Sequence, residues 1–333
     1  MVSSIPFCII LAVLCSDAHF VERISNSTDA LNFIVMGDWG GLPVVPYYSP
    51  FEKATASAMA QVAKYNDSRY IFALGDNFYY DGVTNVSDPR FQTTFENVFS
   101  QQSLMDIDWF LVAGNHDHNG NVSAQIAYSH HSRRWQFPDM WYQVHLQRPS
   151  FNMTIIMIDT VVLCGNTGEH GELEQPQGPE NLLMAETQLM YIESALMNAS
   201  KWSQYILVMG HFPVYSIAEH GPTECLIDVL DPLLVKYKVS AYFNGHDHNL
   251  QHIRHPTSGM NYFVTGAVDV VDPSMKHVDN IPNGSLLFHW ADIFGLGGFA
   301  TVDVDKNGME VRFHKASVQP GDILYKYHIP PRM

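Results

Sequence analysis

The chain has 333 residues, of which 46% are hydrophobic and 12% aromatic, and its formal net charge at pH 7 is -16. A chain of this length and apolar content can bury a large core in one layered domain. The excess of acidic residues argues against a nucleic-acid-binding protein, which needs a basic surface. A phosphate-bearing small substrate is still compatible with it, because a bound metal ion supplies local positive charge that residue counting misses.

The first eighteen residues resemble a secretory signal peptide. The apolar run at 5–15 is followed by the small-residue sequence Ser16-Asp17-Ala18, which suits a cleavage site. About eleven apolar residues are too few to span a bilayer, and no later stretch is long enough. We therefore expect a signal peptide at 1–18, no membrane span, and one secreted or lysosomal domain at 19–333.

Two of the four cysteines, Cys164 and Cys225, lie beyond the predicted signal peptide. An even pair in an oxidising compartment predicts one disulfide between them, and two buried free thiols are the alternative. Seven Asn-x-Ser/Thr sequons predict a glycoprotein. The candidate glycosylation sites are Asn26, Asn66, Asn85, Asn121, Asn152, Asn198 and Asn283.

Five short apolar strands are predicted, and each ends in a glycine followed by a polar side chain. In chain order they are 31–36 before Gly37-Asp38, 70–74 before Gly75-Asp76 with Tyr79, 109–113 before Gly114-Asn115-His116, 204–209 before Gly210-His211, and 239–244 before Gly245-His246-Asp247-His248. Because the carboxyl ends of such strands point at one site, the polar side chains should converge. Their types predict a metal site in an enzyme.

The segments between these strands carry helix and hairpin patterns. Ser49 and Pro50 predict the start of a helix with apolar residues at helical spacing up to position 62. Further helices are predicted at 88–99, around 189–196 and at 222–237, where Pro232 implies a kink or a later start. Residues 21–30 read as a loose start, 141–146 and 151–159 as paired strands, and 299–304 with 309–314 as a hairpin.

The segment 165–181 breaks the pattern, since it holds four Glu, four Gly and two Pro. It predicts an exposed, mobile, acidic loop that proteases would reach first.

The number and type of the converging side chains indicate two metal ions rather than one. Anionic oxygens are offered by Asp38, Asp76 and Tyr79, and a neutral oxygen by Asn115. Imidazoles are offered by His211, His246 and His248. Seven ligands fit a pair of ions that share Asp76 as a bridge. The phenolate of Tyr79 favours Fe(III) in one position. The other position suits Fe(II), Zn(II) or Mn(II).

Taken together, the five blocks resemble the signature of the purple acid phosphatases, which are calcineurin-like metallophosphoesterases. The Asp-Trp-Gly-Gly form of the first block and the sequence Ile-Ala-Glu-His-Gly-Pro-Thr at 217–223 make the chain similar to the small animal-type, tartrate-resistant members. The resemblance runs from residue 31 to the end of the chain. It implies an α/β fold, a four-layer α/β/β/α sandwich of two mixed sheets flanked by helices.

The resemblance also implies a role for each matching residue. Asp38, Asp76, Tyr79 and His248 would hold the ferric ion, and Asp76, Asn115, His211 and His246 the divalent ion. His116 and His220 would contact phosphate and assist proton transfer, and Glu219 would orient His220. The implied reaction is hydrolysis of phosphate monoesters, small molecules or phosphoproteins, by a metal-bound hydroxide at acid pH. We expect the enzyme to be a monomer.

In the same family, cleavage of an exposed loop over the site relieves repression, and the segment 165–181 matches that loop. The family's disulfide would fall at Cys164 and Cys225 and tether it.

Two other functions stay open. One is a colourless Zn or Mn phosphoesterase acting on diesters or nucleotides, which a Tyr79 that does not coordinate would favour. The other is a secreted glycoprotein that keeps the fold for binding without turnover. Tyr80 is expected to be a packing residue. His116 has an alternative role, in which it only orients Asn115. His118 and His130 are expected to lie at the surface or to be hydrogen-bonded in the core.

Overall fold

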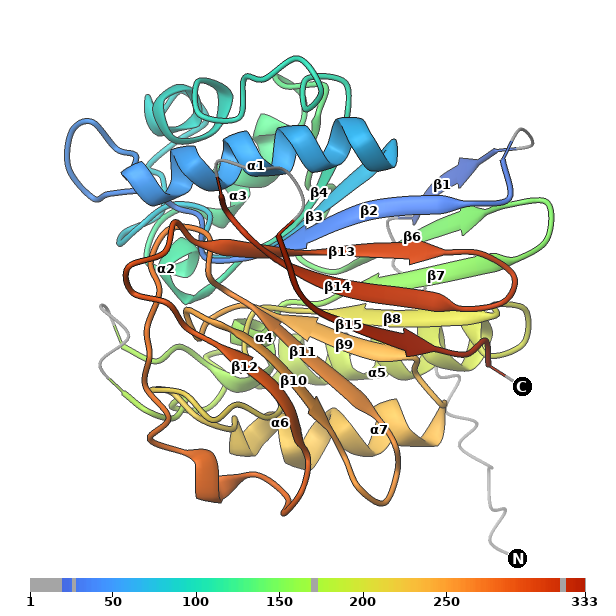
Figure 1. The fold of residues 1–333 in the computed structure, drawn as a ribbon. Helices are drawn as coiled ribbons and strands as arrows, with labels where there is room; N and C mark the ends of the chain where they lie inside the picture. Colours follow the sequence, from blue (N-terminus) through green and yellow to red (C-terminus); the bar gives the residue numbers. More distant parts are fainter. Residues whose placement is uncertain (1–19, 26–27, 169–172, 318–321, 333) are drawn as a thin grey trace, which may run out of the picture.

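The computed structural model describes residues 20–25, 28–168, 173–317 and 322–332. The predicted signal peptide at 1–18 and the sequon at Asn26 lie outside these residues. The described chain forms two β-sheets packed face to face with helices on both outer faces (Figure 1). This arrangement confirms the predicted four-layer α/β/β/α sandwich.

The first sheet has a parallel centre continued by an antiparallel edge. Its seven strands are, in spatial order, β15 (Ile323–Ile329), β14 (Met309–Lys315), β13 (Gly298–Val304), β2 (Leu31–Met36), β3 (Tyr70–Leu74), β4 (Asp108–Val112) and β5 (Trp135–Gln136). Strands β2, β3 and β4 run parallel, with Phe33 opposite Tyr70 and Tyr70 opposite Asp108. Their carboxyl ends therefore lie along one edge.

The second sheet repeats this plan. Its eight strands are β1 (Phe20–Ile24), β6 (Tyr142–Gln147), β7 (Asn152–Met157), β8 (Tyr205–Met209), β9 (Ala241–Asn244), β11 (Asn261–Thr265), β10 (Leu250–Arg254) and β12 (Leu286–Trp290). Strands β7, β8 and β9 are parallel, with Leu207 opposite Ala241. Every residue of β8 and β9 is buried, as expected for strands that are covered on both faces.

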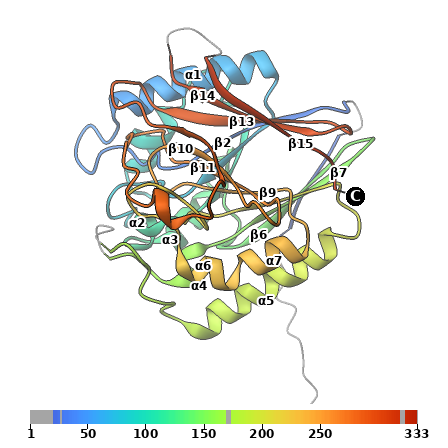
Figure 2. The same cartoon turned by 60° about the horizontal axis from the view of Figure 1, so that its bottom comes forward.

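The helices complete the outer layers and the loops. They are α1 (Pro50–Asn66), α2 (Asn115–His118), α3 (Val122–Tyr128), α4 (Thr160–Cys164), α5 (Leu182–Ala199), α6 (Glu224–Val229) and α7 (Asp231–Lys236), with a π-helical turn at Phe91–Glu96 and a 3-10 turn at Val278–Asn280. Helix α1 covers the first sheet, whereas α5, α6 and α7 cover the second (Figures 1 and 2). Two buried apolar clusters result, one extending through the first sheet and the space between the sheets, the other between the second sheet and its helices.

Several local predictions are confirmed. Ser49 caps α1 through its side chain, which accepts a hydrogen bond from the backbone N–H of Glu52, and Pro50 occupies the first turn. The predicted helix at 222–237 is two helices, because Pro232 lies in the first turn of a new one. The hairpin forms in the expected register, with Val304 opposite Met309.

Two predictions about local structure are corrected in part. Residues 21–24 do not form a loose start, because they belong to β1, which pairs in parallel with β6, and Phe20 lies opposite Gln143. A helix lies within the predicted range 88–99, but it is a π-helix that spans only Phe91–Glu96 and is followed by turns. The partner strand of β1 lies more than a hundred residues away, so periodicity within the segment could not reveal it.

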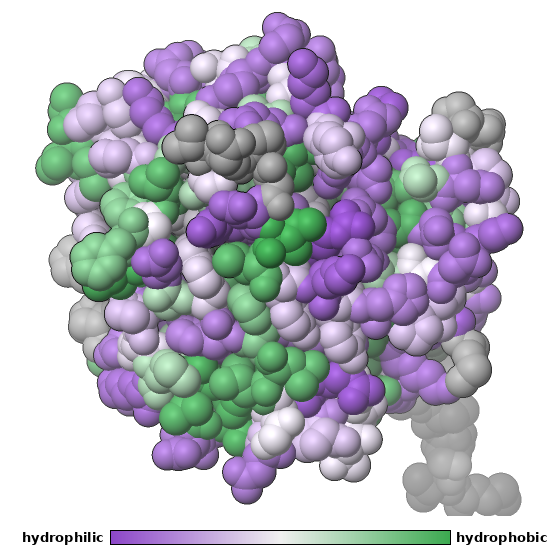
Figure 3. Space-filling model, viewed as in Figure 1, coloured by the Kyte–Doolittle hydropathy of each residue, from purple (hydrophilic) through white to green (hydrophobic). Residues whose placement is uncertain are grey.

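On the face shown in Figure 3, apolar side chains gather low in the view, over strands β10 to β12. Leu287 of β12 is one exposed apolar residue of this region. Among the described residues, no helix is both long and apolar enough to cross a membrane. Of the predicted glycosylation sites, Asn85, Asn121, Asn198 and Asn283 are exposed, and Asn66 and Asn152 are half-buried.

Candidate metal centre

Five strands from both sheets deliver polar side chains to one edge, which lies near α2 on the left of Figure 1. The loops after β2 and β3 supply Asp38 and Asp76, and helix α2, which follows β4, supplies Asn115. The loops after β8 and β9 supply His211 and His246. Asp38, Asp76 and His246 have positive φ angles of 58°, 50° and 70°. Such backbone strain at non-glycine residues concentrates at functional sites.

Glycines let these loops approach one another. A Cβ atom on Gly75 would lie 2.7 Å from both the Nδ1 of His211 and the backbone nitrogen of Gly114. A Cβ atom on Gly114 would collide with the carboxylate of Asp76. Gly75 and Gly114 are therefore required by close packing between the loops.

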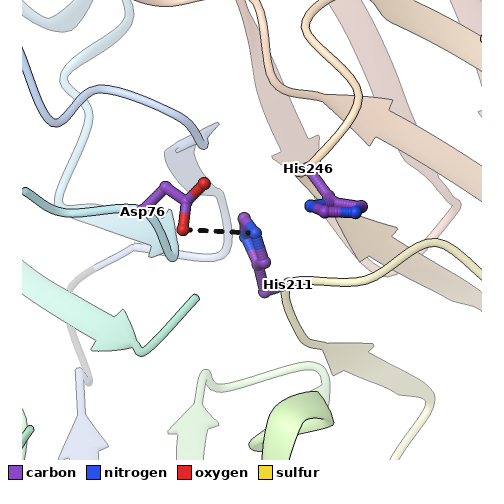
Figure 4. A group of neighbouring side chains, drawn as sticks. All are labelled: Asp76, His211 and His246. Atoms are coloured by element: carbon purple, nitrogen blue, oxygen red, sulfur yellow. Dashed lines mark ion pairs between the residues drawn. The ribbon is translucent and has the colours of Figure 1, made fainter. Parts of the chain in front are cut away.

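Asp76, His211 and His246 form the first group, and their candidate ligand atoms all lie within 4.8 Å of one another (Figure 4). The Nδ1 of His211 lies 2.8 Å from the backbone oxygen of Leu74, to which it donates. The Nε2 faces Asn115 Oδ1 at 2.9 Å and Asp76 Oδ1 at 3.4 Å. It carries a lone pair when the ring is neutral, as the ring would be beside a bound cation. Three acceptors that converge in this way fit a cation between them.

Asp38, Asp76 and His248 form the second group within the same 4.8 Å limit. The Tyr79 hydroxyl lies 3.2 Å from Asp38 Oδ1 and 3.0 Å from His248 Nε2. Asp76 belongs to both groups, so the geometry matches the predicted bridging position. The structure thus brings together all seven side chains that were predicted as ligands.

The protonation equilibria reflect this concentration of charge. Burial lowers the pKa of His211, but the carboxylate of Asp76 raises it by more, to about 9. Burial likewise lowers the pKa of His248, and hydrogen bonding and attraction to Asp38 raise it to about 9. Burial and then the neighbouring Asp38 carboxylate raise the pKa of the Tyr79 hydroxyl well above 10. A phenolate at this position therefore requires a strongly positive neighbour.

A cavity of about 180 Å³ opens over the two groups. His116 and His220 both line it. The backbone N–H of His116 donates to Asp76 Oδ1 at 3.1 Å. The ring of His220 stacks on that of His246 with centroids 4.1 Å apart, and its backbone N–H donates to Asp247 Oδ1 at 3.1 Å. Both histidines can therefore reach a group bound over the candidate ligands.

Two residues lie differently from expectation. The carboxylate of Glu219 accepts from the Ser274 hydroxyl at 2.9 Å and pairs with Lys276 at 3.3 Å, and it faces solvent. Tyr80 is not a packing residue, because it is 46% exposed and lines the cavity beside His116.

Sequence reasoning missed the residues that brace the loops. Asp117 is fully buried and accepts hydrogen bonds from the backbone of Asn77 at 3.0 Å and of Gly114 at 2.8 Å, and from the Gln125 side chain at 2.8 Å. Arg90 donates to the backbone oxygens of Tyr79 and Gly40. Asp117 directly follows His116 in the sequence. A carboxylate in this otherwise buried segment could have indicated that it accepts hydrogen bonds there.

The segment 165–181 is tied down where it is described. The Gln175 side chain bonds the backbone of Pro222 and Glu224, and Glu174 pairs with Lys276. The predicted disulfide between Cys164 and Cys225 is present and joins the start of this segment to α6. Residues 169–172 of the segment lie outside the described part of the chain.

Comparisons with known proteins agree with this geometry. The family model described as calcineurin-like phosphoesterase matches residues 15–250. The tartrate-resistant acid phosphatase type 5 of Oryctolagus cuniculus is 47% identical over 309 residues, which cover 92% of this chain and 93% of the relative. Purple acid phosphatase 7 of Arabidopsis thaliana is 32% identical over 254 residues, covering 74% and 72%.

Solved structures share the fold. GAP50, described as the anchor in the inner membrane complex of Plasmodium, superposes with a TM-score of 0.77 at 25% identity, covering 92% of this chain and 90% of its own. The purple acid phosphatase PPD1 from yellow lupin superposes with a TM-score of 0.60 at 17% identity, covering 92% of this chain and 54% of its own. The same architecture thus occurs in a phosphatase and in a protein described as an anchor.

Proposed function

Because the chain belongs to the purple acid phosphatases of the calcineurin-like phosphoesterase family and is an acid phosphatase, we propose that it hydrolyses phosphate monoesters at an Fe(III)–M(II) pair, where M is Fe, Zn or Mn. The observation that carries the proposal is the membership of Asp76 in both ligand groups, directly beneath the cavity. The donor set also fits the ions, since one group contains a phenol and the other an amide oxygen and imidazoles.

Each group would hold one ion. The ferric ion would lie between Asp38, Asp76, Tyr79 and His248, and the divalent ion between Asp76, Asn115, His211 and His246. The hydrogen bond from His211 to Leu74 supports this assignment, because it directs the free Nε2 toward the other ligands.

The bound ions would supply positive charge that favours ionisation of water and offsets the charge on the phosphoryl oxygens. His116 and His220 line the cavity from opposite groups of loops, and each would contact the phosphate or donate a proton to the leaving alcohol. Glu219 would act on His220 through the backbone they share, since its carboxylate is held by Ser274 and Lys276.

A visible absorption spectrum tests the ferric assignment. The purified, metal-replete protein should show a broad purple-to-pink band, because phenolate bound to Fe(III) absorbs visible light. Tyr79→Phe should abolish the band, and Tyr80→Phe, which changes the adjacent exposed ring, should leave it intact. A folded, metal-containing parent without colour would contradict the ferric site and favour the Zn or Mn phosphoesterase acting on diesters or nucleotides.

The likeness to the Plasmodium anchor favours a second candidate, a protein that keeps the fold for binding. The complete ligand set argues against it, and undetectable hydrolysis of an aryl phosphate by the metal-replete protein would revive it. The remaining proposals are that residues 19–333 form one catalytic domain after a signal peptide, and that the monomeric enzyme is secreted or lysosomal. Its substrates would be small phosphomonoesters or phosphoproteins.

A further inference from the structure

Helix α4 and its flanking residues contact the segments that carry Asn115, His116 and His211. Asp159, which caps its first turn, pairs with His118 of α2. The Thr160 hydroxyl accepts from the backbone N–H of Phe212, next to His211. Asn166, two residues beyond its end, donates to the backbone oxygen of Asn115 at 3.1 Å. The predicted site at the strand ends therefore rests against this one helix.

The Asp159 side chain is held from several directions. Its Oδ2 lies 2.8 Å from the Nε2 of His118, and its Oδ1 accepts from the backbone N–H of Val162 at 2.9 Å. Both its backbone groups bond the Gln188 side chain, at 2.8 and 2.9 Å. Asp159 is fully buried. A carboxylate fixed in this way can set the orientation of its partner.

The partner helix α2 needs such a contact, because it consists of four residues and a single turn is not stable by itself. Asn115 begins α2, His116 follows, and His118 ends it. Asn115 and His118 are three residues apart and lie on neighbouring positions of one face. A rotation of the turn about its axis would therefore move all three side chains together.

We propose that the His118–Asp159 pair is a positioning device, which fixes the rotation of α2 and thereby the aim of Asn115 and His116 over the metal centre. Neither residue lines the cavity above the ligands. Both residues would act on the site through helix α2. Burial lowers the pKa of His118, but attraction to Asp159 raises it by more, to above its ordinary value.

This inference rests on the proposed phosphatase function, and the first experiment separates the two. Steady-state kinetics on an aryl phosphate would be measured for the parent, His118→Ala, Asp159→Asn and the control His130→Ala, whose side chain is exposed in the turn after α3. Bound metal and melting temperature would be measured on the same samples. An inactive parent would refute the proposed function and leave no positioning role to support.

With an active parent, His118→Ala and Asp159→Asn should each lower kcat by about 10- to 100-fold with little change in KM, as loss of residues behind a ligand does. Dialysis against a mild chelator should remove the ion assigned to Asn115 first, leaving one ion per chain where the parent keeps two. His130→Ala should match the parent. A lower melting temperature with unchanged kcat and metal content would reduce the pair to a structural contact and overturn the proposal.

Chemical rescue gives a second readout. His118 lines a separate cavity of about 260 Å³, with Met140, Val161 and Met184 among its apolar walls. In His118→Ala, added imidazole can enter through this cavity and bind Asp159, so kcat should recover. The double variant His118→Ala/Asp159→Asn should show no recovery, and the parent titrated with imidazole corrects for its binding to the metals. Equal recovery in the single and double variants would contradict the pairing.

Discussion

Replacing Asp117 by asparagine should weaken the fold and the metal centre together. The carboxylate accepts three close hydrogen bonds from buried donors, on Asn77, Gly114 and Gln125, and both oxygens are used. Whichever way the new amide turns in Asp117→Asn, its NH₂ group faces at least one N–H. An unsatisfied buried donor costs about 1–3 kcal/mol.

Burial, together with repulsion from Asp76, raises the pKa of Asp117 to about 6. Ionising the native carboxylate at pH 7 therefore costs free energy that the amide does not incur, and this offsets part of the loss. We expect Asp117→Asn to lower the free energy of unfolding by about 1–2 kcal/mol, because the offset removes part of the cost of the unsatisfied donor. Because the braced loops carry Asp76 and Asn115, metal affinity should fall by about 10- to 100-fold.

Urea unfolding and metal titration of the purified variant measure both effects. Asp106→Asn is the matched control, because Asp106 is an aspartate whose side chain is 85% exposed, and such a substitution changes stability by about 0.5 kcal/mol at most. If Asp117→Asn unfolds at the same urea concentration as the parent and binds metal equally well, the loops do not depend on this brace.

Three further predictions follow from the site and from α1. Asp76→Ala should lose both ions and activity together, as metal analysis would show; retention of two ions per chain would disprove the bridge. His220→Ala should keep both ions but turn over more slowly, and loss of metal would mean that His220 is itself a ligand. Burial, and then repulsion from the Asp269 carboxylate, raise the pKa of Glu52. The folded state therefore binds this proton more tightly than the unfolded state does. As a result, the free energy of unfolding falls as pH rises above about 4.3, the pKa of a glutamate in the unfolded chain. Glu52→Gln keeps the cap and should flatten this decline in unfolding experiments from pH 4 to 7; a variant less stable than the parent at pH 7 would contradict it.

The candidate ligands could be predicted from the sequence because each follows closely after one of five predicted strands. A buried strand, a glycine and a polar residue are adjacent in the chain, and parallel strands align their ends. The pattern therefore contained both the residue types and their convergence. Asp38 and His246 needed no knowledge of distant contacts to be identified.

The supporting residues could not be predicted, because their roles depend on contacts between distant segments. His118 meets Asp159 across 41 positions of sequence, and neither stands in a pattern that indicates the other. Tyr80 follows Tyr79 in the chain, and nothing in their order says which ring faces the ligands and which the solvent. The pairing of β1 with β6 joins strands of alternating burial with no local turn between them.

The division of the candidate ligands between the two sheets affects how the protein can mature. Asp38 and Asp76 follow strands of the first sheet, and His211, His246 and His248 follow strands of the second. Each ligand group draws on both, so neither sheet alone offers a complete binding site. Ions that bind only the docked sheets stabilise the native state over every partly assembled one. Metal loading would then report that the two halves of the chain have met, and retained metal would mark a correctly assembled molecule.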